Sequence, residues 1–242
     1  MKAMVFAAGL GTRLRPLTDK TPKALVTVNG KTVLERVLSS LHDSGFNDIL
    51  INVHHHARQV KKFIEEKQFP GIKITLSDES DLLLDTGGGL KKAAWFFDDP
   101  KPFLLHNVDV LSDIDLEAAY RSHLERRPLA TLIVHRRQTD RLLLFDDQMN
   151  MSGWKNARTG TVKNPGGKSV LHEFAFSGIH VIDPSIFPLI KHQGVFSIID
   201  VYLELLVTQK IHGFEVSGHR WMDIGSMEDL QAAENYYKGH SL

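Results

Sequence analysis

The sequence MVFAAGLGTR at residues 4–13 decides the fold, because an apolar strand runs directly into a glycine-rich turn. Glycine adopts positive φ and carries no Cβ, so the backbone N–H groups of such a turn can converge on an anion. Arg13 in the turn and Lys23 after it add the positive charge that a polyphosphate requires. We therefore expect a polyphosphate-binding loop formed by Ala8, Gly9, Gly11, Thr12, Arg13 and Lys23.

Two common nucleotide-binding motifs are excluded by the residues that follow. A dinucleotide-binding fingerprint needs a third glycine or an alanine at position 14, where this chain has Leu14. A Walker P-loop needs Gly-Lys-Ser/Thr after four spacer residues, and that pattern is absent. For a bare Gly-x-Gly, an ordinary strand-to-helix turn with surface arginines is an equal alternative. The downstream Pro22-Lys23 makes that alternative the weaker one.

The composition is that of an ordinary globular protein of 242 residues, long enough to bury a core without disulfides. Its 29 basic and 29 acidic residues balance, so no overall field attracts nucleic acid or an anionic membrane. The sequence has no cysteine, which excludes thiol nucleophiles and Cys-based zinc sites, and no stretch approaches the roughly 20 apolar residues of a membrane span. We expect a cytoplasmic protein with a single domain over residues 1–242, and the sequence leaves its oligomeric state open.

Short apolar runs alternate with helical patterns in the first half of the chain, which predicts an α/β fold. From residue 129 onward, strands follow one another without long helices, which indicates a small antiparallel addition. The polar stretch 146–169 is rich in Gly and Asn, so we expect turns or a mobile flap there. The expected helices are 32–44, 60–67, 89–97, 198–207 and 227–237, and the expected strands are 4–6, 49–53, 72–76, 103–105, 130–135, 142–145, 174–181 and 214–216.

Residues 7–25, AAGLGTRLRPLTDKTPKAL, resemble the signature of the sugar-1-phosphate nucleotidyltransferase family, and the similarity extends in pieces over nearly the whole chain. The resemblance implies a Rossmann-like three-layer α/β/α sandwich with a mixed central sheet. It also implies that Arg13 grips the triphosphate and that Lys23 contacts the reacting phosphates, which makes both candidate catalytic residues. The chemistry needs no protein nucleophile, because a sugar phosphate is already an anion that can attack the α-phosphate.

Two aspartates are the candidate metal ligands. Asp109 follows an expected strand, and Asp223 lies in a Trp-Met-Asp-Ile-Gly-Ser segment that resembles the family's late Trp-x-Asp-x-Gly-Thr. Two converging carboxylates suit Mg²⁺, which shares its remaining positions with phosphates and water. Taken singly, each aspartate could instead be a helix cap or turn former. The family usually has Gly or Ser where this chain has Val108, so the backbone beside Asp109 is expected to be slightly displaced.

The acceptor side of the site is expected around two further segments. Leu84-Asp85-Thr86-Gly87-Gly88-Gly89 is expected to precede a helix and to offer free N–H groups, although a flexible loop is the alternative. It resembles the Glu-Thr-Gly-Gly-Gly segment of the N-acetylmuramate-1-phosphate uridylyltransferase branch, with Asp85 in place of Glu. Residues 176–179, FSGI, resemble a family strand that faces the sugar. On this likeness Gly87 is assigned to the nucleotide, and the sugar phosphate is assigned to Asp85, Gly88, Asn107, Ser177 and Gly178.

Other segments carry weaker predictions. Many long family members have a Glu-Lys-Pro segment whose lysine binds the sugar phosphate, and the nearest match here is Lys163-Asn164-Pro165, which makes Lys163 a weak candidate. The triplet 54–56, HHH, is expected in a strand-to-helix turn rather than around a metal. No hexapeptide-repeat segment follows the last expected helix, so we expect no coupled acetyltransferase.

The sequence thus predicts a Mg²⁺-dependent enzyme that joins a nucleoside triphosphate, UTP by the branch likeness, to a sugar 1-phosphate such as N-acetylmuramate 1-phosphate. A guanylyl- or cytidylyltransferase acting on heptose, mannose or phosphocholine is the alternative with the same chemistry. A catalytically inactive regulatory protein that senses nucleotide sugars is the alternative of another class. Such relatives typically lose the loop arginine, the Pro-Lys pair or the aspartates, and this chain keeps them all.

Overall fold

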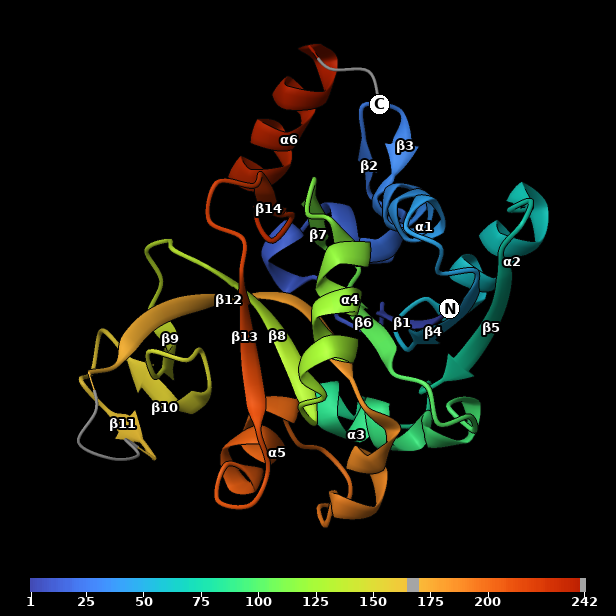
Figure 1. The fold of residues 1–242 in the computed structure, drawn as a ribbon. Coiled ribbons are helices and arrows are strands. Elements are labelled where there is room, and N and C mark those ends of the chain that lie inside the picture. The colour runs from blue at the N-terminus through green and yellow to red at the C-terminus, as the bar shows by residue number, and fades with distance from the viewer. Residues whose placement is uncertain (165–169, 240–242) are drawn as a thin grey trace. The chain divides into compact units, whose positions relative to one another are not determined.

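A computed structural model describes residues 1–164 and 170–239 of the chain (Figure 1). The chain forms two compact units, and each is described by itself. The first unit comprises Met1–Leu83, His106–Ile114 and Arg220–Leu242, and the second comprises Leu84–Leu105 and Asp115–His219. The single-domain organisation expected from the sequence stays a prediction.

The first unit is built on three parallel strands, β1 (Lys2–Phe6), β4 (Asp48–Val53) and β5 (Lys73–Asp78), with β4 between the other two. Most residues of β1 and β4 are buried, as expected for parallel strands that are covered on both faces. The pairing runs as far as Phe6 with Asn52 and Val53 with Asp78. The carboxyl ends of the three strands therefore lie at one edge, where open α/β sheets place their ligands.

Helix α1 (Val33–Asp43) illustrates how the local sequence specifies a helix of this unit. Thr32 and Glu35 form a reciprocal capping box at its start, and its buried side chains follow the helical period. Gly45, with φ of 82°, directly follows the C-cap residue Ser44, a position that favours glycine. The other helices of this unit are α2 (Ala57–Lys67), at the right of Figure 1, and α6 (Met227–Gly239), at its top.

Two short antiparallel pairs complete the first unit. Strand β2 (Thr27–Val28) pairs with β3 (Lys31–Thr32), and β7 (Val110–Ser112) pairs with β14 (Trp221–Asp223). The second pair joins segments more than a hundred residues apart, with Asp223 opposite Val110. Asp109 and Asp223 are brought to the same place by this pairing.

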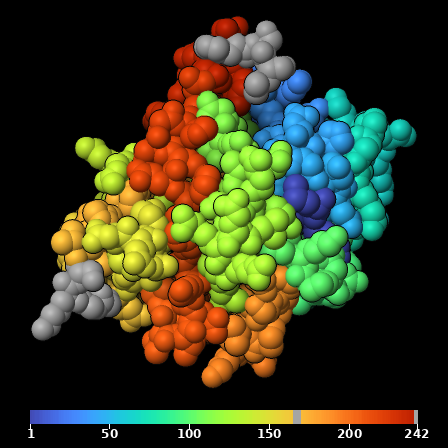
Figure 2. All heavy atoms as spheres, viewed as in Figure 1, coloured from blue at the N-terminus to red at the C-terminus, as the bar shows by residue number. Residues whose placement is uncertain are grey.

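The second unit contains a mixed sheet. Strand β12 (His172–Ile182) pairs antiparallel with both β8 (Ala130–His135) and β9 (Arg141–Phe145), whereas β13 (Ile211–Glu215) runs parallel to β8. Its further strands are β10 (Met151–Asn156) and β11 (Val162–Lys163), and β6 (Phe103–Asn107) runs from this unit into the first. Its helices are α3 (Asp85–Lys92), α4 (Leu116–Arg126) and α5 (Ile198–Leu205), of which α4 lies on the face seen in Figure 2.

The α/β class, the mixed sheet and the small antiparallel additions are as predicted. Among the residues that the structure describes, no helix combines the length and the apolar content needed to cross a membrane. Short 3₁₀ turns connect several elements and lie at Thr12–Leu14, Leu17–Asp19, Lys23–Leu25, Ala94–Phe96 and Pro184–Leu189.

The structure differs from the expectations in three segments. The helix expected at 89–97 starts earlier, at Asp85, so the three glycines lie inside α3 instead of in a loop before it. The described part of 146–169 contains turns at 147–148 and 157–159, as expected, but it also forms strands β10 and β11, and residues 165–169 lie outside the described part. Helix α4 was not anticipated, although Asp115 caps it by accepting a 2.8 Å bond from the Ala118 N–H.

The glycines of α3 are required by packing. A Cβ on Gly88 would lie 2.3 Å from the carbonyl oxygen of Gly194, and one on Gly87 would lie 2.4 Å from the Phe196 ring. The backbone N–H groups of both glycines donate to the Phe196 carbonyl oxygen, at 2.9 Å and 3.3 Å. Helix α3 therefore lies against the segment before α5 closely enough to exclude any side chain.

The substitution Gly88→Ala should destabilise the protein by about 1–3 kcal/mol, because the gain in helix propensity does not offset an overpacked backbone contact. Urea unfolding measures this difference. Gly239→Ala is the matched control, since a Cβ there meets nothing within 4 Å among the described residues. Equal stabilities for the two variants would show that α3 has room to shift.

Candidate active site

The glycine-rich loop follows β1 at the carboxyl edge of the parallel strands. Gly11 has φ of 64°, and a Cβ there would lie 2.8 Å from the methyl group of Thr18 and 3.3 Å from the Cβ of Lys23. The Thr18 hydroxyl also donates a 2.8 Å hydrogen bond to the Gly11 carbonyl oxygen. Gly11 is therefore needed both for its backbone conformation and for the close packing of the loop on Thr18 and Lys23.

The start of the loop is held by a buried side-chain bridge. The Ala7 N–H donates to Asn52 Oδ1 at 2.8 Å, and Asn52 Nδ2 donates to Glu79 Oε1 at 2.8 Å. Both Asn52 and Glu79 are buried, and the Glu79 N–H donates to the Val53 carbonyl oxygen. Side chains thus continue the connection between the three strands beyond the end of the backbone ladder.

Neither Asn52 nor Glu79 is among the site residues predicted from the sequence. The available signal was a polar residue at the end of an otherwise apolar strand, Ile49-Leu50-Ile51-Asn52-Val53. A buried amide side chain needs partners for both its donor and its acceptor, and here it finds them on the two neighbouring strand ends.

Lys23 lies at the centre of the charged part of the site. Its side chain is only 10% exposed, and its ammonium group forms an ion pair with Asp109 Oδ2. The same nitrogen lies 4.0 Å from Asp223 Oδ1. A buried ammonium is stable only when it is paired, and the two aspartates supply that charge.

The backbone fixes both aspartates. Asp109 lies between β6 and β7, and its carbonyl oxygen accepts a 2.8 Å bond from the Ile224 N–H. Val108 is buried, and its N–H donates to the Phe6 carbonyl oxygen at the end of β1, at 3.0 Å. The unusual valine is therefore bonded directly to the strand that leads into the glycine-rich loop.

The positive charges near Asp223 do not fully compensate its carboxylate. Burial, and after it the negative charge of Asp109, raise the pKa of Asp223, although Lys23 and Arg13 act in the opposite direction. Its Oδ1 atom is buried and has no hydrogen-bond partner among the described residues. The ionised form of this carboxylate is thus incompletely compensated.

Arg13 reaches the same aspartate from the loop. Its Nη2 lies 3.8 Å from Asp223 Oδ2, and its side chain is 67% exposed. A Cβ on Gly225 would lie 2.7 Å from that guanidinium group, so the glycine two residues after Asp223 leaves room for Arg13. The sequence had identified the Asp-Ile-Gly segment but not this role of Gly225.

The structure therefore brings together, within the first unit, the loop, both cations and both aspartates. Asn107 ends β6 two residues before Asp109, and its carbonyl oxygen bonds to His106 Nδ1 at 2.8 Å. Burial lowers the pKa of His106 to about 4, so this imidazole is neutral at physiological pH. The ligands of these residues stay predictions.

Apart from Asn107, the expected acceptor residues lie in the second unit. Asp85 has φ of 59° and accepts the Thr86 N–H at 2.6 Å. Ser177 is buried and its hydroxyl oxygen accepts the Ile179 N–H at 3.2 Å, and Gly178 has φ of 80° where the pairing of β12 with β8 shifts register. The expectation of free N–H groups at Gly87 and Gly88 was wrong, because both donate to Phe196.

The weaker candidates have structural partners. Lys163 lies 3.4 Å from Asp200 and over the Trp154 ring at 5.6 Å. The histidine triplet forms the turn between β4 and α2, as predicted, and His54 bonds to the Glu79 carbonyl oxygen at 2.6 Å. Within the described part of the chain, no group of three or more His, Cys, Asp or Glu side chains could hold a metal ion.

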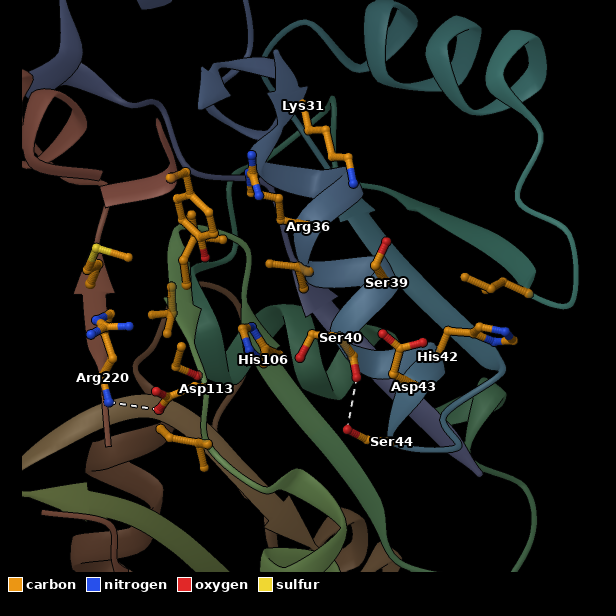
Figure 3. A pocket seen from close by; sticks show the side chains of 18 of the residues that line it. Lys31, Arg36, Ser39, Ser40, His42, Asp43, Ser44, His106, Asp113 and Arg220 are labelled. Carbon is orange, nitrogen blue, oxygen red and sulfur yellow. Dashed lines mark hydrogen bonds between the residues drawn. The ribbon is translucent and has the colours of Figure 1, made fainter. Parts of the chain in front are cut away.

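A cavity of about 590 Å³ lies elsewhere in the first unit (Figure 3). It is lined by side chains from α1, β7, β14 and α6, and also by His106 of β6 and by Arg220, which precedes β14. The Arg220 N–H donates to Asp113 at 2.7 Å on one wall. Neither Lys23 nor the two aspartates line this cavity, so it is distinct from the charged site.

Comparison with known proteins identifies relatives of this chain. A family model described as nucleotidyl transferase matches residues 2–142. The N-acetylmuramate alpha-1-phosphate uridylyltransferase of Neisseria meningitidis serogroup B is 31% identical over 237 residues, which cover 97% of each chain. A UTP--glucose-1-phosphate uridylyltransferase of Synechocystis is 28% identical over 96% of this chain, which spans 62% of the length of that relative.

Solved structures confirm the fold. The UDP-glucose pyrophosphorylase of Acinetobacter baumanii superposes with a TM-score of 0.81 over 98% of this chain and 92% of its own, at 18% identity. This likeness extends the α/β assignment to the Rossmann-like architecture predicted from the sequence.

The substitution Asn52→Leu should lower the free energy of unfolding by about 1–3 kcal/mol, because it leaves the Ala7 N–H and the Glu79 carboxylate without this partner. Chemical denaturation checks the value. Glu79→Gln is the control, since the side-chain amide oxygen of the new residue can still accept from Asn52. It should lower the free energy of unfolding by less than Asn52→Leu does. A loss below about 0.5 kcal/mol for Asn52→Leu would show that the bridge is not needed to hold the loop.

Proposed function

The chain belongs to the nucleotidyl transferase family, and on this premise we propose that it joins a nucleoside triphosphate to a sugar 1-phosphate and releases pyrophosphate. The observation that carries the proposal is the position of Lys23, between two aspartates and against the glycine-rich loop. We propose UTP as the nucleotide, because both relatives described above are named for uridylyl transfer.

The acceptor that we propose is N-acetylmuramate 1-phosphate. The supporting relative aligns with this chain over 97% of its own length, whereas the glucose-1-phosphate relative aligns over 62%. Glucose 1-phosphate is the second candidate on the same grounds. An enzyme with these substrates would act in the cytoplasm, where nucleoside triphosphates are made, and would supply a nucleotide sugar for the cell wall.

Mg²⁺ is the metal that we propose for this site, with Asp109 and Asp223 as its protein ligands. The donor set fits, since Mg²⁺ prefers oxygen ligands and usually takes one or two carboxylates together with phosphates and water. The buried Oδ1 of Asp223 has no hydrogen-bond partner among the described residues, and that is an atom which a cation would satisfy. When bound, the ion would neutralise charge on the phosphate oxygens.

The protein's own groups would act chiefly by placing and neutralising two anions. Arg13, exposed at the loop, would grip the outer phosphates, and the backbone N–H groups around Gly9 would line the phosphate chain. Lys23 would stabilise charge on the α-phosphate while a sugar-phosphate oxygen attacks in line and pyrophosphate leaves. No general base is required, because the attacking oxygen is already ionised at neutral pH.

A panel of four nucleoside triphosphates against several sugar 1-phosphates, with Mg²⁺ and pyrophosphate release as the readout, tests this function. We expect turnover with UTP and N-acetylmuramate 1-phosphate to exceed that of every other pair. Nucleotide binding without turnover in any combination would favour a sensor of nucleotide sugars instead of an enzyme. Preference for GTP or CTP would correct the choice of base alone.

Removal of a site cation should slow the reaction. Arg13→Ala and Lys23→Ala should each lower kcat/KM by about 10²–10³-fold, the usual loss for one electrostatic donor to a transition state. Steady-state kinetics gives the value. Lys62→Ala, an exposed lysine paired only weakly with Glu66 at 3.6 Å, is the control and should retain the parent rate. Parent-like rates for Lys23→Ala would remove it from the catalytic site.

Asp223→Asn should abolish Mg²⁺-dependent turnover without lowering the melting temperature of the metal-free protein at neutral pH. The raised pKa of Asp223 means that the folded state binds this proton more tightly than the unfolded chain. Protonated Asp223 therefore adds to the free energy of unfolding below the ordinary pKa of 3.8, and this contribution is lost as pH rises through the pKa of the folded state. The neutral amide avoids that loss, which melting curves across pH measure.

Asp140→Asn supplies the control, because Asp140 is exposed and pairs at 3.6 Å with Arg158 in the second unit. It should retain both turnover and the parent's pH dependence of stability. Near-parental turnover of Asp223→Asn would show that the metal assignment is wrong.

A further inference from the structure

The ammonium group of Lys23 occupies the place where a cation would meet the two aspartates. It contacts Asp109 Oδ2 and lies 4.0 Å from Asp223 Oδ1, and its side chain is nine-tenths buried. A Mg²⁺ ion that uses the same carboxylates as ligands needs their oxygens at about 2.0–2.1 Å. The ion and the ammonium group would then compete for the same negative charge and repel each other.

We propose that Lys23 is a built-in competitor of the divalent cation, which yields the aspartates only when a triphosphate offers its ammonium group a new partner. The proposal rests on the proposed function, because the triphosphate and the metal come from it. Metal alone then binds weakly, and metal and triphosphate bind cooperatively. The site would thereby avoid holding the ion before its nucleotide arrives.

The backbone of Lys23 is held in place, whereas the end of its side chain can move. Its carbonyl oxygen accepts the Val26 N–H at 3.1 Å in the short turn Lys23–Leu25, which holds the backbone. The side chain is a flexible four-carbon stem that ends in a compact ammonium group with three donors. The glycine-rich loop packs on that stem, since a Cβ on Gly11 would lie 3.3 Å from the Lys23 Cβ. Phosphates held by the loop would therefore lie near the lysine.

Arg13 is a cation of the same site that does not compete in this way. Its Nη2 lies 3.8 Å from Asp223 Oδ2, it pairs with neither oxygen that faces Lys23, and two thirds of its side chain is exposed. Its guanidinium group lies against the Gly225 backbone. Removal of Arg13 lowers the local positive charge by the same one unit as removal of Lys23, so it separates direct competition from the general field.

The test measures binding of Mg²⁺ alone, by isothermal titration and by the rise in melting temperature with MgCl₂. Four proteins are compared: the parent, Lys23→Met, Lys23→Arg and Arg13→Met. We expect Lys23→Met to bind Mg²⁺ at least about tenfold more tightly than the parent, and Arg13→Met to gain clearly less. Lys23→Arg should bind the ion as weakly as the parent, because it keeps the charge.

The second readout is the coupling between metal and nucleotide. A non-hydrolysable UTP analogue should raise the Mg²⁺ affinity of the parent by at least about tenfold, and by linkage Mg²⁺ should raise the analogue's affinity by the same factor. This mutual factor should fall several-fold in Lys23→Met, because the competitor that the analogue displaces is gone. If Lys23 only binds phosphate and does not compete with the ion, Lys23→Met would bind Mg²⁺ alone with the same affinity as the parent.

Three results would overturn the proposal: equal Mg²⁺ affinity in the parent and Lys23→Met, an equal or larger gain in Arg13→Met, or an undiminished coupling factor. Should Lys23→Met fail to fold without metal, Lys23→Gln takes its place, and the coupling measured in the parent alone must still be present. Failure of the proposed function appears differently. It would be seen as an absence of turnover with every substrate pair, while the Mg²⁺-only comparison keeps its outcome.

Discussion

The ion pair between Lys23 and Asp109 is the contact on which the rest of the site depends, because it ties the segment after the glycine-rich loop to the turn after β6. The Lys23 side chain is nine-tenths buried, so its ammonium group has lost most of its contact with water and the Asp109 carboxylate compensates for that loss. The pairing of β7 with β14 then brings Asp223 to the same lysine from near the end of the chain. Three distant segments thus converge on one buried charge.

Where these segments meet, the negative charge of Asp109 and Asp223 exceeds the positive charge close to them. This excess is the physical basis of the proposed chemistry. One ammonium group serves two carboxylates, and Arg13 approaches Asp223 at 3.8 Å from solvent. The raised pKa of Asp223 and its unpartnered Oδ1, judged among the described residues, express the same deficit. A site in this state favours the arrival of further positive charge together with a polyanion that can share it.

The scaffold supports this arrangement through polar groups as much as through its apolar core. Backbone pairing between β1, β4 and β5 stops at the carboxyl edge, and the Asn52–Glu79 bridge continues it by side chains up to Ala7. In the second unit helix α3 is held in place by close packing, since Gly87 and Gly88 approach Phe196 and Gly194 without room for a Cβ. Glycines in the two units therefore serve different purposes. Gly11 shapes a loop, whereas Gly87 and Gly88 allow a helix to pack.

The sequence by itself determined the class of fold and the turn after the first strand, because glycine spacing and apolar runs are local properties of the chain. It also predicted the site residues Arg13, Lys23, Asp109 and Asp223 from motifs that resemble those of the family, and their roles stay predictions. It misplaced the start of α3 and missed α4, since interior glycines and a weak apolar stripe imitate loops when the packing partner is unknown. Only the tertiary structure decided that Lys23 lies between the two aspartates, that Asn52 reaches Glu79 and that Gly225 makes room for Arg13. These contacts join residues that are distant along the chain, and their partners are fixed by strand pairing and burial, which no local pattern encodes.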